Sequence, residues 1–162
     1  TEHLPAGGQV LARVRRNSGF HLLDDDRPLI LIGNGTGLAG LRSLLRARAL
    51  AGQGRNWLLF GERTRAHDAF FDEELQGWVA SGVLTRLDRC FSRDVGDGRY
   101  VQHLIAAHAD ALSAWVARGA AVYVCGSLEG MSRGVHAALE AMLGEEAVIE
   151  MIEEGRYRRD VY

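Results

Sequence analysis

Four glycines lie within the eight residues Gly33–Gly40, and the last six of these residues read Gly-Thr-Gly-Leu-Ala-Gly. This spacing matches the G-x-G-x-x-G pattern of dinucleotide-binding turns. Glycine lets a backbone approach a phosphate closely, and a helix that begins at such a turn presents free N–H groups to an anion. The stretch therefore predicts a phosphate-binding turn.

A second cluster of polar side chains consists of Ser92, Arg93 and the run Arg99–Gln102. A hydroxyl and two guanidinium groups suit a phosphate dianion, which arginine can bind through two parallel hydrogen bonds. Tyr100 could stack on an adenine. The cluster is typical of a pocket for the 2′-phosphate of NADP, and an ordinary polar loop before a helix is the alternative.

Glu62 lies near the position where NAD-binding folds carry an acid for the ribose hydroxyls, about 20 residues after the glycines. Arg63 and Arg65 stand beside it and argue against binding of NAD. Two interpretations of Glu62, a ribose-binding acid and a solvated loop carboxylate, remain equally open.

Cys125 ends the apolar run Ala121–Gly126. A small cysteine in such a run more often serves packing than chemistry. The other cysteine, Cys90, shows no metal-ligand spacing with it, so both are expected to be free thiols in a reducing compartment, with one disulfide as the alternative.

The remaining residue types exclude several chemistries. The six histidines show no ligand spacing, so no metal site is expected. All 19 basic residues are arginine, which removes a Walker-type lysine and a Schiff-base mechanism from consideration. A hydrolase of nucleoside triphosphates is therefore only a weak third possibility.

Length and composition indicate one ordinary globular domain. The chain has 162 residues, of which 47% are hydrophobic and 25% charged. Its formal net charge is −2, so it lacks the excess of positive charge that is typical of nucleic-acid-binding proteins. No apolar run approaches the length of a membrane span, and the first residues show no signal-peptide pattern.

These candidate residues need elements to position them, and the chain from Pro28 onward alternates apolar runs with helical patterns. Four leucines of the first helix can share one face. Strands separated by helices of this length form right-handed βαβ units, so we expect an α/β fold with a five-stranded parallel sheet and helices on both faces. Ligands of such sheets bind at the carboxyl ends of the strands. The expected strands are Leu29–Ile32, Asn56–Gly61, Val83–Phe91, Ala120–Cys125 and Arg156–Tyr162. The expected helices are about Leu38–Ala51, Ala69–Ser81 (with Phe70, Leu75, Trp78 and Val79 inward), Val101–Arg118, Met131–Leu143 and Glu145–Glu154.

Residues 1–27 differ from the rest. Val10–Arg16 alternates like a strand, and Phe20–Leu23 could form another short strand before the acidic run Asp24–Asp26. We interpret residues 1–27 as the remnant of a preceding β domain rather than a core element, or as a tail, and residues 28–162 as the domain proper.

Taken together and in order, these motifs resemble the NADPH-binding half of the ferredoxin–NADP⁺ reductase superfamily, most closely its diflavin reductase branch, which includes cytochrome P450 reductase and the sulfite reductase flavoprotein. The resemblance covers about five-sixths of the chain, from Pro28 to Tyr162. It implies a Rossmann-like fold similar to the C-terminal domain of ferredoxin reductases. The matching segments are Ile32–Ala39, Phe60–Arg63, Ser92–Arg93, Arg99–Gln102, Tyr123–Gly126 and Tyr157–Tyr162.

The resemblance implies roles for these residues. Gly35, Thr36 and Gly37 would hold the pyrophosphate of NADP(H). Cys125 and Asp160 would flank the nicotinamide and the flavin N5 during hydride transfer, and Tyr162 would stack on the isoalloxazine ring until nicotinamide displaces it. The residues expected to bind the adenosine half, the 2′-phosphate and the rest of the cofactor are Arg63, Ser92, Arg93, Arg99, Tyr100, Gln102 and Gly126.

Three departures from the family pattern stand out. Gly40 replaces the usual proline after the glycine motif, and Ser127 replaces an acid after Cys125-Gly126. The motifs of the FAD-binding β-barrel are missing, and residues 9–23 resemble only the last part of such a barrel.

The resemblance implies an oxidoreductase module that passes hydride from NADPH to FAD held by a missing domain or subunit, with electrons moving on to a further acceptor. It would be a fragment of a flavoprotein that is cytoplasmic or the cytoplasmic part of a membrane-anchored reductase. The alternative is a binding-only sensor or regulatory domain for pyridine nucleotides.

Overall fold

The computed structural model describes residues 7–11, 13 and 17–162. Within this part of the chain, five strands form one parallel sheet in the order β3-β2-β1-β4-β5. This arrangement confirms the α/β architecture expected from the alternating sequence pattern. The strands are β1 (Leu29–Asn34), β2 (Asn56–Glu62), β3 (Leu84–Phe91), β4 (Ala121–Gly126) and β5 (Tyr157–Val161).

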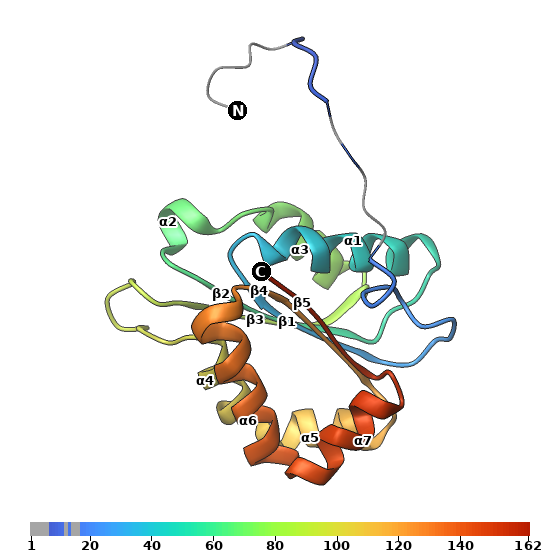
Figure 1. Ribbon diagram of the computed structural model, residues 1–162. Coiled ribbons are helices and arrows are strands. Elements are labelled where there is room, and N and C mark those ends of the chain that lie inside the picture. The colour runs from blue at the N-terminus through green and yellow to red at the C-terminus, as the bar shows by residue number, and fades with distance from the viewer. Residues whose placement is uncertain (1–6, 12, 14–16) are drawn as a thin grey trace.

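Helices cover both faces of the sheet (Figure 1). On one face lie α1 (Gly37–Leu50) and α3 (Asp72–Ala80), and the short α2 (Arg65–Asp68) precedes α3. On the other face lie α4 (Val101–Ala107), α5 (Ala109–Ala117), α6 (Arg133–Leu143) and α7 (Glu145–Glu153). An irregular turn, η1 (Leu128–Ser132), connects β4 to α6.

Each face of the sheet has its own apolar core. Ile30, Ile32 and Val124 point toward the α4–α7 layer, whereas Leu31 and Phe60 point toward α1 and α3. Such continuous burial of adjacent residues is typical of strands covered on both sides. The four leucines expected on one face of α1 are all buried: Leu38, Leu41, Leu44 and Leu45.

The chain places its later strands on opposite sides of β1. From β1 it adds β2 and β3 on one side, and it then returns to place β4 on the other side of β1. The loops that leave β1 and β4 therefore diverge, which opens a crevice at the carboxyl edge. The predicted ligand-binding loops all lie along this edge.

The predicted helix Ala69–Ser81 begins later than expected, at Asp72. Phe71 precedes it with φ 55°, a left-handed conformation that ends any helix running through it. Residues 69–71 therefore belong to no helix, and a separate short helix, α2, ends just before them at Asp68. Leu75 and Trp78 do pack inward, but the prediction was wrong for Phe70 and Val79, which are exposed.

The single helix predicted for Val101–Arg118 is divided into α4 and α5 at His108, where φ is −120° and ψ is 23°. The His108 ring lies among residues of β2 and β3. It is 3.2 Å from the Asp88 carboxylate and packs at a tilt against Trp57. These tertiary contacts lie at the break between the two helices. The periodicity of the sequence gives no sign of them, so it predicted one continuous helix.

The segment before β1 belongs to the core, contrary to our prediction for it. Phe20 is 8% exposed and packs edge-on against Tyr123, with ring centroids 5.4 Å apart. The Tyr123 hydroxyl donates a hydrogen bond to the His21 carbonyl at 2.7 Å. Phe20–Leu23 forms no strand. Of the other expected strand, Val10–Arg16, residues 12 and 14–16 lie outside the described residues.

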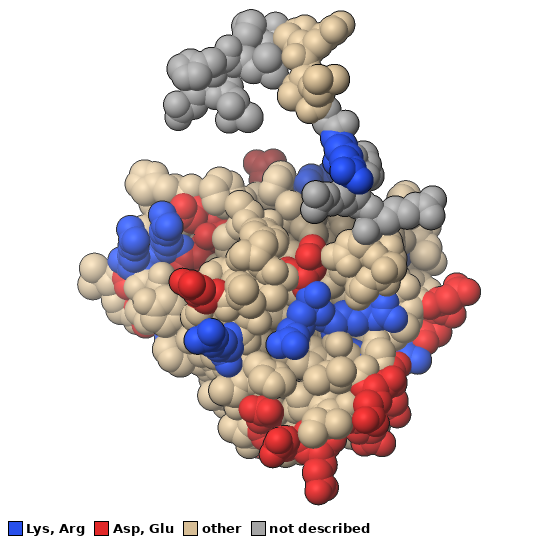
Figure 2. Space-filling model, viewed as in Figure 1, with Lys and Arg blue, Asp and Glu red and all other residues tan. Residues whose placement is uncertain are grey.

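Charge is unevenly distributed over the surface. Acidic side chains gather at the lower right and bottom of the view in Figure 2, where α7 lies in Figure 1. Because β5 begins just after α7 ends, these carboxylates stand at the amino edge of the sheet, away from the crevice. Among the described residues, no helix is long and apolar enough to cross a membrane.

Candidate functional site

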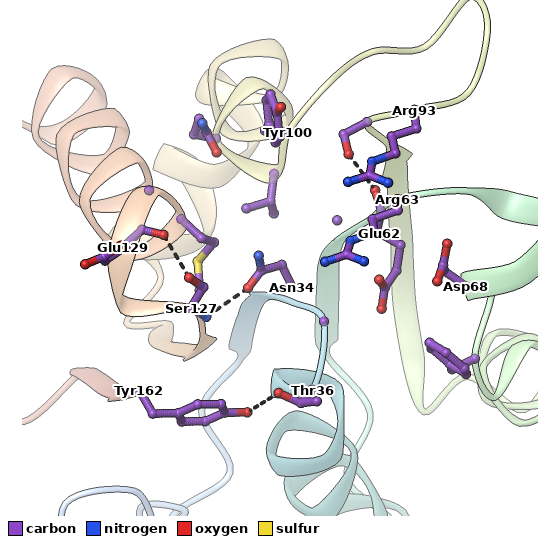
Figure 3. Close-up of a pocket in the computed structure, with 18 residues that line it drawn as sticks. Asn34, Thr36, Glu62, Arg63, Asp68, Arg93, Tyr100, Ser127, Glu129 and Tyr162 are labelled. Carbon is purple, nitrogen blue, oxygen red and sulfur yellow. Dashed lines mark hydrogen bonds between the residues drawn. The ribbon is translucent and has the colours of Figure 1, made fainter.

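A cavity of about 840 Å³ lies at the carboxyl edge of the sheet. Its walls come from the ends of β1 and β2, the loop after β3, the start of α4, the turn after β4 and the chain end (Figure 3). It brings together eight residues predicted from the sequence: Gly35, Thr36, Arg63, Ser92, Arg93, Tyr100, Gln102 and Tyr162. Five others do not line it: Gly37, Arg99, Cys125, Gly126 and Asp160.

The glycine turn is shaped by contact with β4 as well as by access to the cavity. A Cβ atom on Gly33 or Gly37 would overlap the Cys125 carbonyl oxygen, and one on Gly37 would also lie 2.7 Å from the Gly126 nitrogen. Gly35 instead faces open space with φ +54°. Its conformation, rather than crowding, therefore favours glycine there. The first turn of α1 carries no acidic residue and no capping side chain, so no carboxylate competes with an anion for the N–H groups of the turn before it.

The C-terminal residue lies across the mouth of this turn. The Tyr162 hydroxyl is 2.8 Å from the Thr36 hydroxyl, as Figure 3 shows. The Tyr162 backbone is held on both sides, because its N–H donates to Gly126 and its carbonyl accepts from Leu128. The ring remains 63% exposed. The last residue is thus anchored by its backbone while its side chain stays accessible.

The ends of β2 and β3 are joined by hydrogen bonds that place two arginines together. The Ser92 N–H and hydroxyl both donate to the Glu62 carbonyl, at 2.8 and 3.2 Å. The Arg93 N–H donates to the Arg63 carbonyl at 2.8 Å. Figure 3 shows the two guanidinium groups on the same side of the cavity. A hydroxyl and two cations at one end of a cavity suit a phosphate group.

The other residues of the predicted adenosine pocket are placed differently from one another. Arg99 forms an ion pair with Asp97 at 2.6 Å, and it does not reach the cavity wall. Tyr100 lines the cavity at the start of α4, where its ring packs edge-on against His103. Gln102 also lines the cavity and packs closely against Gly134 of α6.

Cys125 faces away from the cavity. Its side chain is 2% exposed in the apolar layer beneath α1, and a Cβ on Gly40 would come within 2.9 Å of its sulfur. Burial raises the pKa of the Cys125 thiol to about 11, and the nearby Asp160 carboxylate adds to this shift. Asp160 pairs with Cys125 in the register of β4 and β5. The thiol is therefore protonated near neutral pH.

Several residues of the site gave little signal in the sequence. Asn34 ends β1, and its side-chain oxygen accepts a hydrogen bond from the Ser127 N–H at 3.0 Å. This bond ties the two diverging loops of the crevice together. The only hint was a polar residue among the glycines directly after a buried strand. Glu129, Met131 and Asp68 also line the cavity, and nothing in their spacing indicated it.

Glu62 lies in the cavity wall and is half-buried. Burial and then the charge of Asp68 raise the pKa of Glu62 to about 7, against the effect of the nearby arginines Arg89 and Arg63. Its Oε1 atom is buried without a hydrogen-bond partner. Glu62 is thus not a freely solvated loop residue.

The described side chains include no group of three or more His, Cys, Asp or Glu placed to hold a metal ion. Both cysteines are free and buried. The cavity wall does present arginines, hydroxyls and backbone N–H groups, which are the groups that bind anions in proteins.

Comparison with known protein families finds a match over residues 31–137 to the oxidoreductase NAD-binding domain. Among curated proteins, the chain is 42% identical over 171 positions to the sulfite reductase [NADPH] flavoprotein alpha-component of Vibrio cholerae, covering 98% of this chain and 28% of that protein. The protein of the same name from Bacillus subtilis is 36% identical over 173 positions, covering 99% and 29%. The chain thus spans less than a third of the length of these relatives.

Proposed function

Since the chain belongs to the oxidoreductase NAD-binding domain family, as an NADPH-binding domain of the ferredoxin–NADP⁺ reductase type, we propose that it delivers hydride from NADPH to FAD held elsewhere. The observation that carries this proposal is the cavity with two anion-binding ends. One end is the glycine turn before α1, and the other is the joined tips of β2 and β3.

The residues present fit a dinucleotide that carries an extra phosphate. The free N–H groups of the turn at Gly35 and Thr36 would hold the pyrophosphate. Arg93 and Arg63 would hold the 2′-phosphate, because guanidinium groups bind phosphate oxygens in pairs. The Ser92 hydroxyl would join them only after leaving the Glu62 carbonyl. Tyr100 and Gln102 line the cavity beside this end, which supports their assignment to the adenosine. Arg99 would contribute only after leaving Asp97.

The nicotinamide end lies at the turn after β4 and the chain end. NADP(H) and FAD, when bound, supply the hydride chemistry, and this chain orients the reacting groups and excludes water. Tyr162 would cover the nicotinamide position, and opening it requires loss of its hydrogen bond to Thr36. Asp160 and Cys125 would act on this end only from behind the cavity wall, because they lie opposite each other on β5 and β4 and neither lines the cavity. Gly126 leaves room for Asn34, whose Oδ1 atom a Cβ there would overlap.

The partner that holds FAD is proposed to be a domain or subunit outside this chain, and a further acceptor would receive the electrons. The relatives are flavoprotein components more than three times as long as this chain, which is consistent with additional domains. Residues 1–27 would be the end of the preceding FAD-binding domain, with Phe20 packed into the apolar layer beneath α1.

The proposal is tested by titrating the protein with NADP⁺ and with NAD⁺ in a calorimeter. We expect NADP⁺ to bind more tightly. Arg93→Ala should weaken NADP⁺ binding by roughly 10- to 100-fold and leave NAD⁺ binding nearly unchanged, because it removes a charge-assisted hydrogen bond to the 2′-phosphate.

The matched control is Arg65→Ala. Arg65 is also exposed, but it stacks over Phe91 and does not line the cavity. Its loss should reduce affinity for both nucleotides by the same small factor. Equal affinities of the native protein for NADP⁺ and NAD⁺, or equal losses in Arg93→Ala, would contradict the proposed 2′-phosphate site.

A further inference from the structure

The cavity proposed to hold the phosphates of NADP(H) also contains a carboxyl group, that of Glu62 at the end of β2. It lies one residue from Arg63, and its own backbone carbonyl positions Ser92. The side chain is directed into the wall between α2 and the strand ends, as Figure 3 shows. A phosphate bound at the strand tips would therefore approach a group that can carry the same charge.

The charged groups around Glu62 do not neutralise it fully. From its own strand and the loop after β3, Arg63 and Arg93 line the cavity, and α2 adds the carboxylate of Asp68 beside Arg65 and His67. Hydrogen bonds from Thr64 hold the pKa of Asp68 below its usual value, so Asp68 is ionised and repels a charge on Glu62.

Behind Glu62, on the same face of the sheet, lies Arg89 of β3. Its side chain is 6% exposed and donates from Nη1 to Asp72 of α3 at 2.6 Å. Its Nε and Nη2 atoms are buried without partners, and so is the Oε1 atom of Glu62. The nearest buried cation is thus engaged with another acid, and Glu62 has no hydrogen-bonded counter-ion.

We infer that NADP(H) binds this chain together with one proton, which is taken from solvent by the Glu62 carboxylate. The inference rests on the proposed function. Phosphates in the cavity add negative charge beside a half-buried carboxylate whose Oε1 atom has no hydrogen-bond partner, and protonation removes the repulsion. The resulting O–H group can donate a hydrogen bond to a phosphate or ribose oxygen, which an ionised carboxylate cannot do.

The direction of the pH dependence follows from linkage. The pKa of Glu62 is about 7 without ligand and rises when the phosphates bind, so the proton is taken up only where Glu62 is ionised beforehand. Between this pKa and the higher pKa of Glu62 in the complex, the dissociation constant for NADP⁺ should rise by about tenfold per pH unit, and above both values it should level off. Below the pKa of the free protein, this group contributes no uptake. A phosphate monoester has its second pKa at about 6, so the 2′-phosphate of NADP⁺ does not change its charge at pH values above the pKa of Glu62.

The experiment measures the heat of NADP⁺ binding at about pH 8 in two buffers of different ionisation enthalpy, which gives the number of protons exchanged. We expect uptake approaching one proton for the native protein. In Glu62→Gln the uptake should vanish, and NADP⁺ should bind up to about tenfold more tightly than to the native protein at this pH.

Glu129→Gln is the matched control, because Glu129 is an exposed carboxylate of the same cavity. It removes the same charge but should leave the proton uptake of the native protein in place. Circular dichroism of each variant checks folding, and the uptake of the native protein needs no variant at all.

The outcomes separate this inference from the proposed function. If NADP⁺ binds in preference to NAD⁺ but without proton uptake, or if Glu62→Gln weakens binding, Glu62 acts as an ionised acceptor for the ribose hydroxyls, and the inference is overturned while the function stands. If NADP⁺ does not bind at all, both are overturned.

Discussion

Arg48 shows how a single charged side chain is accommodated in the core, at the amino edge of the sheet and therefore opposite the cavity. It lies on α1 and is 1% exposed. Its guanidinium donates to the Asn56 and Gln53 side chains, each at 3.0 Å, and to the Gly54 and Arg27 carbonyls at 2.9 and 3.0 Å. Burial lowers its pKa, but an arginine remains charged. This set of bonds connects α1 to the start of β2 and to the segment before β1.

We therefore predict that Arg48→Met lowers the free energy of unfolding by about 3–5 kcal/mol, because it leaves buried acceptors without donors. Urea denaturation followed by circular dichroism measures the loss. Arg46→Ala serves as the control. Arg46 lies on the same helix, is 55% exposed and pairs with Glu74, so its removal should cost less than about 1 kcal/mol. Equal losses in the two variants would contradict the structural role of Arg48.

Residue-level chemistry was only partly predictable. Ser92, Arg93 and Tyr100 lie at the cavity as the sequence pattern indicated. The raised pKa of Glu62 depends on α2 and β3, which approach it only in the folded chain. The same holds for the Cys125 thiol, whose direction depends on the face of β4 from which it projects.

Among the elements, the connection from β1 to α1 determines the geometry of the site. It is pressed against β4, so that Gly37 has no room for a side chain, whereas Gly35 has room but a left-handed backbone. The glycine pattern thus combines two physical requirements. The sequence pattern predicted that the glycines let a phosphate approach the backbone closely. The structure shows that they also let the neighbouring strand β4 approach it closely.

Two substitutions separate these requirements. Gly37→Ala should cost about 3 kcal/mol or more, because its Cβ meets backbone atoms of Cys125 and Gly126 that cannot move independently of β4. Gly35→Ala should cost about 1–2 kcal/mol, the penalty for a left-handed backbone. Thermal and urea unfolding measure both losses. A Gly37→Ala variant as stable as Gly35→Ala would show that α1 does not pack against β4 as described.

Element boundaries were predicted best where the local pattern was strongest. All five strands agree with the expected runs to within about two residues. The errors fall at Phe71 and His108, where a left-handed residue and a set of cross-element contacts interrupt helical patterns. Neither interruption is marked in the sequence by a proline or glycine. The periodic pattern of apolar residues therefore predicted helices that continue through both positions.

For the molecule as a whole, the distribution of charge and the length of the chain matter most. The five glutamates of α7 and its C-terminal cap stand at the amino edge, so they do not oppose anions entering at the carboxyl edge. The chain covers 28% of its Vibrio cholerae relative, so complete electron transfer is proposed to need the remaining domains.

We predict that the chain alone binds NADP⁺ but oxidises NADPH in the presence of free FAD no faster than buffer does, because free flavin is not oriented at the nicotinamide. Joined to the FAD-binding part of a relative, it should oxidise NADPH at least about 100-fold faster, since a held flavin has a high effective concentration. The decrease in NADPH absorbance measures both rates. If the joined protein binds FAD and NADP⁺ without any gain in rate, the module has a binding-only role.

The sequence by itself determined the alternation of strands and helices, the parallel sheet, the glycine turn and the order of the loops at the carboxyl edge. Each of these depends on residues close together in the chain. Only the tertiary structure decided that Phe20 packs into the core, that the Cys125 side chain points away from the cavity and that Glu62 lies half-buried among charges of both signs. Burial and electrostatic environment are set by neighbours that are distant in sequence, and local patterns do not specify those neighbours.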